Sequence, residues 1–468
     1  LMIPGIALVW GALLAWGVLA GLVATLLTGP VFVISVCVFV AVNKHLVLRT
    51  APTGMHPARS GLGIRKWMVD KLLEFSLLFT NSLYATLYTA PWLRLLGANI
   101  GRGAEVSTVS HIDPDMLTVG KDSFVADMAS VGSARFANGR IMFQPTTIGE
   151  RTFIGNAAVV PSGMDIGDNA LIGVATVPPV NGVPAGTSWL GSPAIYLPNR
   201  QDSGDYNDEL TYAPPREVVR ERYVIEFFRA TLPPTVLGVS FYLYLLVLSS
   251  LAFGRELAVP ALVAPLVAMA SSLAVIGFCA AVKRNTVGPY RPRVEPLWSK
   301  FVRRSEFATG LYESAAVPIG VGMLVGTPFL PMILRWFGST IGKRVWFGTT
   351  YLTEFDLVHV GDDATIGTEA SLQTHLFEDR VMKMSTITVG AGASIGTRSI
   401  ILYDTIIGEQ ASLSPLSLLM KGEELPPKTS WRGIPAEGIR ADTPPSPAAR
   451  TTIHPDATAT DVAEGVPA

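Results

Sequence analysis

Residues 148–173 read IGERTF IGNAAV VPSGMD IGDNAL IG, a run of six-residue units that decides the fold. An aliphatic residue opens each unit, at Ile148, Ile154, Val160, Ile166 and Ile172, and glycine usually follows it. Short repeats of constant length are typical of solenoids. We expect the aliphatic residue to point inward and the small residue to relieve the backbone at a corner. Three such sides make one coil, and stacked coils bury an aliphatic column. A sandwich of short strands is the alternative, which the strict register disfavours.

The same register returns 241 residues later, with aliphatic residues at Val389, Ile395, Ile401, Ile407 and Leu413. Further pairs at this offset are Gly101 and Gly342, Asp115 and Asp356, Phe136 and Phe377, and Arg94 and Arg335. The apolar segments that precede each run match as well. The sequence therefore indicates a duplicated unit of hairpin, basic linker, surface helix and repeat domain.

The composition indicates a membrane protein. Charged residues make up 16% of the 468 residues, against about 25% in soluble domains, and the mean hydropathy is +0.39. A net charge of −1 argues against nucleic acid as a partner. Four apolar runs are candidates for spanning a lipid bilayer, at 3–28, 31–42, 236–253 and 257–282. Short connections between them predict two helical hairpins.

Lysine and arginine set the predicted orientation. Basic clusters follow both hairpins, at 44–71 and 283–304, whereas the hairpin tips carry only Arg255. By the positive-inside rule both hairpins enter and leave on the cytoplasmic side, so we expect a multi-pass protein of the cytoplasmic membrane. Two further uncharged stretches, 75–93 and 314–334, are expected to be interfacial or re-entrant, because a span there would flip the following domain outside.

The chain is thus expected to divide into eight segments. They are transmembrane hairpin 1 (1–50), a basic linker and interfacial helix (51–96), repeat domain 1 (97–200), a linker (201–235), transmembrane hairpin 2 (236–283), a second basic linker and interfacial helix (284–337), repeat domain 2 (338–440) and a disordered tail (441–468). The two cysteines, Cys37 and Cys279, lie in apolar runs and predict no disulfide framework. The Cys and His residues show no spacing typical of a metal site.

The repeat is interrupted at the same place in both domains, where 17 residues separate Val131 from Ile148 and Leu372 from Val389. A loop is expected to leave the coil there. In the second domain it reads QTHLFEDRVMK (373–383), with one histidine and four charges. In the first domain Ala134 stands where His375 stands.

The period of six resembles that of the hexapeptide-repeat acyltransferases, which fold as left-handed parallel β-helices. The closing sequences Trp189-Leu-Gly-Ser-Pro-Ala and Trp431-Arg-Gly-Ile-Pro-Ala strengthen the resemblance. The implied fold class is a membrane protein in which transmembrane α-helical hairpins alternate with two left-handed parallel β-helix domains.

The resemblance also implies a role for His375. Transfer of an acyl group from a thioester needs a base, and a loop histidine supplies it in that family. Glu378 or Asp379 would orient the ring or hold the acceptor's ammonium. Arg380 and Lys383 would meet a phosphate of a phosphopantetheine arm. A solvated loop without a catalytic role is the alternative, and for Lys383 it is the favoured one.

His111 is a rival histidine in the first domain. It precedes an Asp-Pro turn signal, and Leu352 is its equivalent in the second domain. A structural role is therefore expected for His111. The first domain is expected to be catalytically degenerate.

The whole pattern is similar to the membrane C-terminal half of ε-poly-L-lysine synthetase-type nonribosomal peptide synthetases. The residues that carry this resemblance are Pro296-Leu-Trp-Ser and Gln373-Thr-His-Leu-Phe-Glu-Asp-Arg, beside the alternating hairpins and repeats. It implies adenylation and carrier domains as partners, upstream in the same chain or in trans. This chain has two tandem units where the synthetases have three. It also lacks a lysine after the closing Pro-Ala, since Glu437 follows Ala436, which weakens a coenzyme A donor.

The predicted function is a membrane-bound acyltransferase that joins a carrier-bound aminoacyl thioester to an amino acid or short peptide. The donor would be a phosphopantetheine arm, and a homo-oligomer is expected. One alternative is a coenzyme A-dependent acetyltransferase acting on a small or membrane-associated acceptor. Another is a non-catalytic membrane scaffold for a peptide synthetase.

Overall fold

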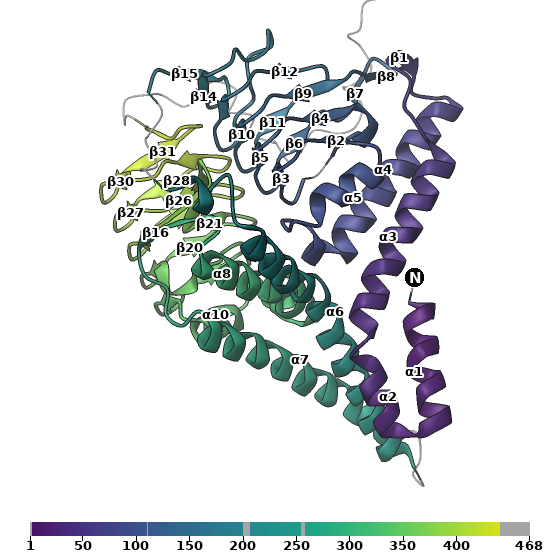
Figure 1. The fold of residues 1–468 in the computed structure, drawn as a ribbon. Helices are drawn as coiled ribbons and strands as arrows, with labels where there is room; N and C mark the ends of the chain where they lie inside the picture. The colour runs from purple at the N-terminus through teal and green to yellow at the C-terminus, as the bar shows by residue number, and fades with distance from the viewer. Residues whose placement is uncertain (1, 110, 200–205, 254–257, 440–468) are drawn as a thin grey trace, which may run out of the picture.

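The computed structural model describes residues 2–109, 111–199, 206–253 and 258–439. The predicted hairpin turn at 254–256 and the predicted disordered tail lie outside these residues. Two stacks of short parallel strands sit at one end of the molecule and a group of long helices at the other (Figure 1).

The first stack covers residues 99–197, and its strands form three sheets, β15-β14-β13-β10-β5-β3, β12-β9-β4-β2 and β11-β6. The strands are β2 (Asn99–Ile100), β3 (Glu105–Val106), β4 (Leu117–Val119), β5 (Phe124–Val125), β6 (Ser130–Val131), β9 (Thr146–Ile148), β10 (Phe153–Ile154), β11 (Val159–Val160), β12 (Asp165–Ile166), β13 (Leu171–Ile172), β14 (Ser188–Leu190) and β15 (Ile195–Leu197). Partners in the regular coils lie 18 residues apart, as in Ile154 and Ile172, so three six-residue sides make one coil.

The aliphatic residues of the period form the buried column. Ile148, Ile154, Ile166 and Ile172 are fully buried. The glycine that follows lies against the next coil: a Cβ on Gly149 would stand 2.5 Å from the backbone nitrogen of Asp168. A larger residue would push the coils apart, which explains the small residue at this corner.

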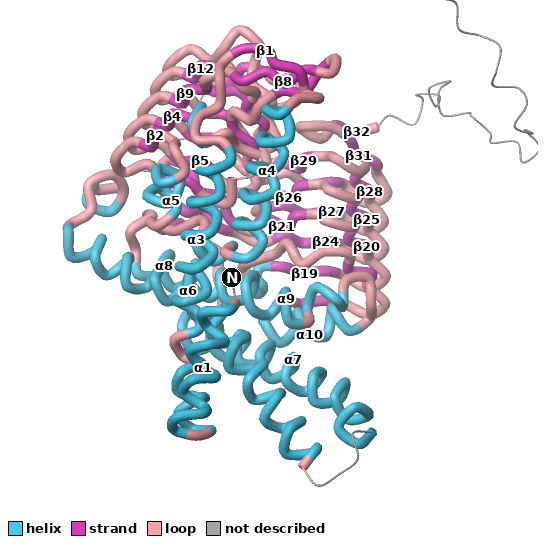
Figure 2. Tube along the Cα trace, turned by 90° about the vertical axis from the view of Figure 1, so that its right-hand side faces the viewer, coloured by secondary structure: helices cyan, strands magenta, loops and turns pink. Residues whose placement is uncertain are grey.

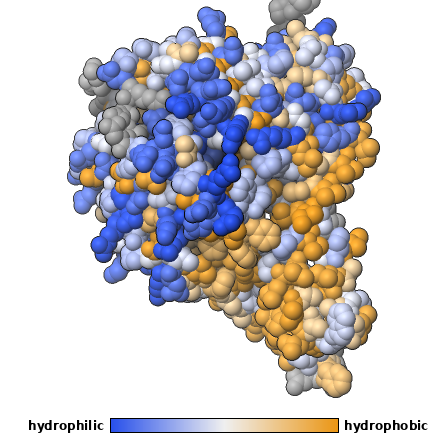
Figure 3. Space-filling view, in the orientation of Figure 1, coloured by the Kyte–Doolittle hydropathy of each residue, from blue (hydrophilic) through white to orange (hydrophobic). Residues whose placement is uncertain are grey.

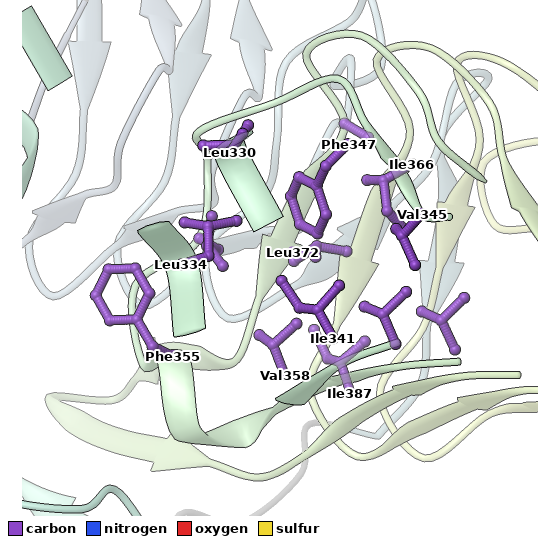
Figure 4. Close-up of a cluster of buried hydrophobic side chains, with 14 of the residues drawn as sticks. Leu330, Leu334, Ile341, Val345, Phe347, Phe355, Val358, Ile366, Leu372 and Ile387 are labelled. Atoms are coloured by element: carbon purple, nitrogen blue, oxygen red, sulfur yellow. The ribbon is translucent and has the colours of Figure 1, made fainter. Parts of the chain in front are cut away.

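The second stack covers residues 340–438 and repeats this arrangement in the sheets β17-β19-β24-β27-β30, β18-β20-β25-β28-β31-β32 and β21-β26-β29. Its strands are β17 (Thr340–Ile341), β18 (Trp346–Phe347), β19 (Val358–Val360), β20 (Thr365–Ile366), β21 (Ser371–Gln373), β24 (Ile387–Val389), β25 (Ser394–Ile395), β26 (Ile400–Leu402), β27 (Thr405–Ile407), β28 (Ser412–Leu413), β29 (Leu418–Leu419), β30 (Glu424–Leu425), β31 (Ser430–Arg432) and β32 (Glu437–Gly438). Its column continues into α10 (Phe329–Phe337), where Leu330 and Leu334 cover the first coil (Figure 4).

The long helices form two antiparallel groups whose tips lie at the same end of the molecule, away from both stacks (Figure 1). The first group is α1 (Ile3–Trp16), α2 (Val18–Thr25) and α3 (Thr28–Val47), and the second is α6 (Arg216–Ala252) and α7 (Ala258–Thr286). Figure 3 shows hydrophobic side chains gathered over this helical end and hydrophilic ones over the stacks.

Three of the described helices, α3, α6 and α7, are long and apolar enough to cross a membrane, rather than the four that were predicted. The first apolar run is divided at Gly17, whose φ of 82° ends α1 and leaves two helices shorter than a span. The predicted linker 201–235 is helical from Arg216 onward. It forms the first part of α6, which runs without interruption through Pro233 and Pro234 into the predicted span.

Neither of the two further apolar stretches forms one helix of spanning length. The first is divided between α4 (Gly61–Phe79), the 3₁₀ turn η1 (Asn81–Leu83) and α5 (Thr89–Leu95). The second contains the π-helix η4 (Tyr312–Ala316), α9 (Val317–Ile319), the 3₁₀ turn η5 (Val321–Leu324) and α10, after α8 (Lys300–Leu311).

Each hairpin is fixed to its own stack by the same contacts. Lys44, at the end of α3, forms an ion pair with Asp115, which also accepts a hydrogen bond from the backbone nitrogen of Ala51. In the second unit Lys283 and the backbone nitrogen of Tyr290 bind Asp356 in the same way. The duplication thus extends to the joints between helices and stacks.

The two stacks lie side by side (Figure 2). Leu190 of the first stack shares a buried cluster with Leu376 and Leu402 of the second. The rings of Phe124 and Phe377 are 5.7 Å apart between the stacks. The two stacks therefore form a shared interface within one chain.

Candidate active site

His375 lies where the repeat is interrupted in the second stack. The loop forms a β-hairpin of β22 (His375–Glu378) and β23 (Val381–Met384), and the linker strand β16 (Arg293–Pro296) pairs with β23. The first unit has the same arrangement in β1 (Gly54–Pro57), β8 (Arg140–Phe143) and β7 (Arg135–Ala137). The basic linker thus pins the loop that carries His375.

Glu354 orients the His375 ring. Nδ1 of His375 lies 2.7 Å from Oε2 of Glu354, whose side chain is buried. The hydroxyls of Thr353 and Thr374 each donate to the same carboxylate oxygen at 2.6 Å. When Nδ1–H donates to Glu354, the neutral ring keeps Nε2 as an acceptor for a proton. The pair has the form of a general base held by a carboxylate.

The electrostatics of this pair favour charge on both members. Burial alone would lower the pKa of His375, but the charge and hydrogen bond of Glu354 outweigh it and raise that pKa above 6.5. Burial alone would raise the pKa of Glu354, but His375 and the threonine hydroxyls hold that pKa below its ordinary value. Glu354 is therefore ionised at neutral pH.

His375 faces a cavity of about 520 Å³ that both stacks and the helices line. The first stack contributes Thr108, Phe124 and Asp127, and the helical segments contribute Arg229 and Glu313. The ring of His375 is 23% exposed, and Phe377 lies beside it with ring centroids 5.5 Å apart. The first stack is therefore one wall of the site on the second stack.

Acidic side chains predominate around this cavity. Glu313, on η4, is exposed to the cavity yet surrounded by protein, and burial together with the charge of Asp127 raises the pKa of Glu313 to about 7. Asp127 is held by hydrogen bonds from the hydroxyls of Ser107 and Thr108. Such a cavity favours a cationic ligand over an anionic one.

The other predicted site residues lie on the hairpin but not against the His375 ring. Glu378 binds Lys383 at 3.1 Å and Lys421 at 2.5 Å. Asp379 and Arg380 form the hairpin turn, with φ of 49° and 61°. The group that orients the ring is therefore Glu354, rather than Glu378 or Asp379.

Arg380 is 3% exposed and reaches across to the first stack. It donates to the carbonyl oxygens of Gly103 and Thr211 and lies 3.8 Å from a carboxylate oxygen of Glu105. Lys383 is 8% exposed. Their predicted contact with a phosphate stays a prediction; Arg380 is placed in the interface between the stacks, and Lys383 is buried and pairs with Glu378.

A second cavity of about 170 Å³ lies between the stacks and shares Leu376 with the first. Its walls are largely apolar, from residues such as Val174, Leu190 and Leu402, and Lys421 lines it. Glu378 and Asp379 line it as well. Of the lysines near the hairpin, Lys421 lines this cavity, where its ammonium binds Glu378.

Known proteins were compared with the chain. The δ-poly-L-ornithine synthetase of Acinetobacter baumannii (strain AB307-0294) is 39% identical over 396 residues, which are 84% of this chain and 30% of that protein. The predicted resemblance to poly-amino-acid synthetases is confirmed. The chain spans less than a third of the length of that relative. No family model matches the chain.

Solved structures with partial similarity are hexapeptide-type acetyltransferases. A galactoside acetyltransferase in complex with coenzyme A is 19% identical with a TM-score of 0.22, covering 24% of this chain and 68% of that one. A maltose O-acetyltransferase from Clostridium difficile 630 is 20% identical with a TM-score of 0.24, covering 34% of this chain and 98% of that one. TM-scores this low carry no argument about the site.

Sequence reasoning missed Glu354, although a signal was present. Asp113 stands 241 residues before Glu354, so both units carry an acid at this position. In the first unit Asp113 binds Lys66 at 2.7 Å, and Ala134 replaces the histidine. His111 is exposed with a φ of 54°, as expected for a turn residue.

Proposed function

We propose that the chain is a membrane-bound acyltransferase that forms an amide between a carrier-bound aminoacyl thioester and an amino acceptor. The observation that carries the proposal is the His375–Glu354 pair, whose free ring nitrogen faces a large cavity rich in carboxylates. The similarity to a poly-L-ornithine synthetase supports an amino acid or short peptide as acceptor. In this proposal the two stacks are left-handed β-helices, and they alternate along the chain with membrane hairpins.

The transfer step uses groups that the chain supplies. Nε2 of His375 takes a proton from the acceptor's neutral amine as the amine nitrogen attacks the thioester carbonyl carbon. The C–N bond forms, the C–S bond breaks, and the thiolate leaves with the proton that the imidazolium returns. Glu354 stabilises the imidazolium in between. The arm of the carrier supplies the thioester through the second cavity.

The partners follow from the reaction. An adenylation domain must activate the amino acid and a carrier domain must present it, in the same polypeptide or in trans. The cavity is built by both stacks of one chain, so a second copy is not needed to complete it. The predicted homo-oligomer stays a prediction.

Removal of the base tests the proposal. In the full chain in detergent or nanodiscs, His375→Ala should lower single-turnover transfer from a loaded carrier by roughly 10²–10⁴-fold, as loss of a general base does. His111→Ala is the matched control, because His111 is exposed on the first stack, and it should keep the wild-type rate.

Two outcomes would contradict the proposal. Wild-type transfer by His375→Ala would support the scaffold alternative. Transfer from acetyl-coenzyme A, with none from the loaded carrier, would support the acetyltransferase alternative.

A further inference from the structure

The two units differ by two residues between the surface helix and the stack. Ser60 and Ser299 both cap a helix N-terminus and stand 239 residues apart, whereas Arg94 and Arg335 stand 241 apart. The first unit's helix α4 is α-helical to Phe79, but the second unit's α8 runs into the π-helix η4. A π-helix absorbs inserted residues and occurs frequently at functional sites. Glu313, in this π-helix, lies on the wall of the cavity.

In the first unit a lysine side chain fills the equivalent position. Lys66, on α4, is 2% exposed, and its ammonium lies 2.5 Å from Asp70 and 2.7 Å from Asp113. At the offset of the helices its equivalent is Ser305, whose hydroxyl lies 3.5 Å from Glu354. In the second unit a short serine thus replaces the lysine, and Ser305 lines the cavity. A lysine ammonium from the chain itself occupies the equivalent position in the first unit.

The polar atoms left at the cavity wall are suited to receive such a group. Asp127 faces the cavity from the first stack and is oriented by hydrogen bonds from Thr108. Oε1 of Gln373, a buried acceptor that lines the same cavity from the second stack, has no hydrogen-bond partner among the described residues. Arg229, which also lines the cavity, donates to the carbonyl of Ala85 and lies 3.9 Å from Glu306.

We infer that Glu313, with Asp127 opposite it on the first stack, binds a second ammonium group of the acceptor, so that the cavity selects diamines over monoamines. This inference rests on the proposed function, because it assigns the reacting amine to His375. One amine of the acceptor meets Nε2 of His375, and the other lies between the two carboxylates. The first stack thereby takes part in substrate selection although it lacks the histidine.

A pair of acceptors of equal length tests the selection. With an aminoacyl thioester of N-acetylcysteamine as donor, the full chain should use 1,4-diaminobutane better than 1-aminobutane. Glu313→Gln and Asp127→Asn should each lower the ratio of kcat/KM for the two acceptors by tenfold or more. Glu424→Gln, on an exposed strand of the second stack, should leave the ratio as in the wild type. An unchanged ratio in Glu313→Gln would overturn the inference.

A binding measurement keeps this test separate from catalysis. In His375→Ala, calorimetry with 1,4-diaminobutane at pH 7 in two buffers should show proton release. Glu313 has a pKa of about 7, so a bound cation drives its remaining protonated fraction to ionise. The groups that act on Glu313 are Asp127, Arg229, Glu354 and, in the wild type, His375. Glu313→Gln in the same background should lose this release and bind at least tenfold more weakly.

The two failures are distinguishable. Binding that depends on Glu313, without transfer by the wild type, would overturn the proposed function and support the subsite. Transfer by the wild type, with equal binding of diamine and monoamine, would overturn the subsite and support the proposed function.

Discussion

Glu354 and His375 come from neighbouring coils of the second stack and meet at the mouth of a cavity. Oε2 of Glu354 receives hydrogen bonds from the ring and from two threonine hydroxyls, and Oε1 receives one from the hydroxyl of Ser305. A carboxylate so satisfied stays ionised even when it is buried, and it fixes the tautomer of the ring. At the residue scale, therefore, Nδ1 of His375 is held by Glu354, and Nε2 is the ring nitrogen that can accept a proton.

The pH dependence of transfer reports this pair. Only neutral His375 accepts a proton, and Glu354 raises the pKa of His375. The rate should therefore fall as the pH drops through a midpoint above 6.5, rather than below about 6.5 as the histidine alone would predict. In Glu354→Gln the charge is lost while burial remains, so the midpoint should move to lower pH. The alkaline plateau should fall by about tenfold or more, because the ring loses its orienting partner.

Rate measurements from pH 5 to 9 check this prediction, with Glu369→Gln as the control. Glu369 is exposed and paired with Arg398, away from the ring. An unshifted midpoint in Glu354→Gln would show that the titrating group is not His375.

At the scale of elements, the first unit fills with Lys66 the position that Ser305 leaves open to the cavity in the second unit. Lys66 joins α4 to the first stack through Asp113, and both of these side chains are buried. Asp70, one turn along the same helix and about a third exposed, binds the same ammonium. Breaking a buried ion pair leaves uncompensated charge and costs about 3–5 kcal/mol. Lys66→Met should therefore lower the free energy of unfolding by about this amount, as measured by chemical denaturation in detergent.

A matched lysine on the same helix serves as control. Lys71 pairs with Glu74 at the surface, with both side chains about half exposed. Such pairs contribute about 0–1 kcal/mol, so Lys71→Met should be nearly neutral. The double variant Lys66→Met/Asp113→Asn should regain part of the lost free energy of unfolding, because it no longer buries an unpaired carboxylate. Equal effects of Lys66→Met and Lys71→Met would contradict the role given to this ion pair.

What the sequence could predict depends on the range of the interactions. The coils were predictable because Ile148 and its successors are set by a fixed period and by contacts with adjacent coils. His375 was predictable from the interruption of that period. Glu354 was not predicted, because its contact joins two loops 21 residues apart. Asp127 was not predicted, because it enters the site only when the two stacks pack together.

At the scale of the whole molecule, the arrangement of helices and stacks bears on orientation. The C-terminal end of α6, the N-terminal end of α7 and the junction of α1 with α2 lie away from the stacks, which lie beside each other at the opposite end (Figures 1 and 2). The basic residues that follow each hairpin lie near the stacks, as Lys44 and Lys283 do in their ion pairs with Asp115 and Asp356. We therefore predict that both stacks lie on the same side of the membrane.

The charge pattern predicts that this side is the cytoplasm. Reporter fusions after residues 205 and 445 should both report cytoplasm. Single cysteines give a finer test, since only Cys37 and Cys279 need replacement. Asp165→Cys on the first stack and Glu424→Cys on the second are exposed positions. In intact cells neither should react with a membrane-impermeant maleimide, and both should react after permeabilisation. Labelling of either one in intact cells would place that stack outside, and labelling of just one would mean that 75–93 or 314–334 crosses the membrane.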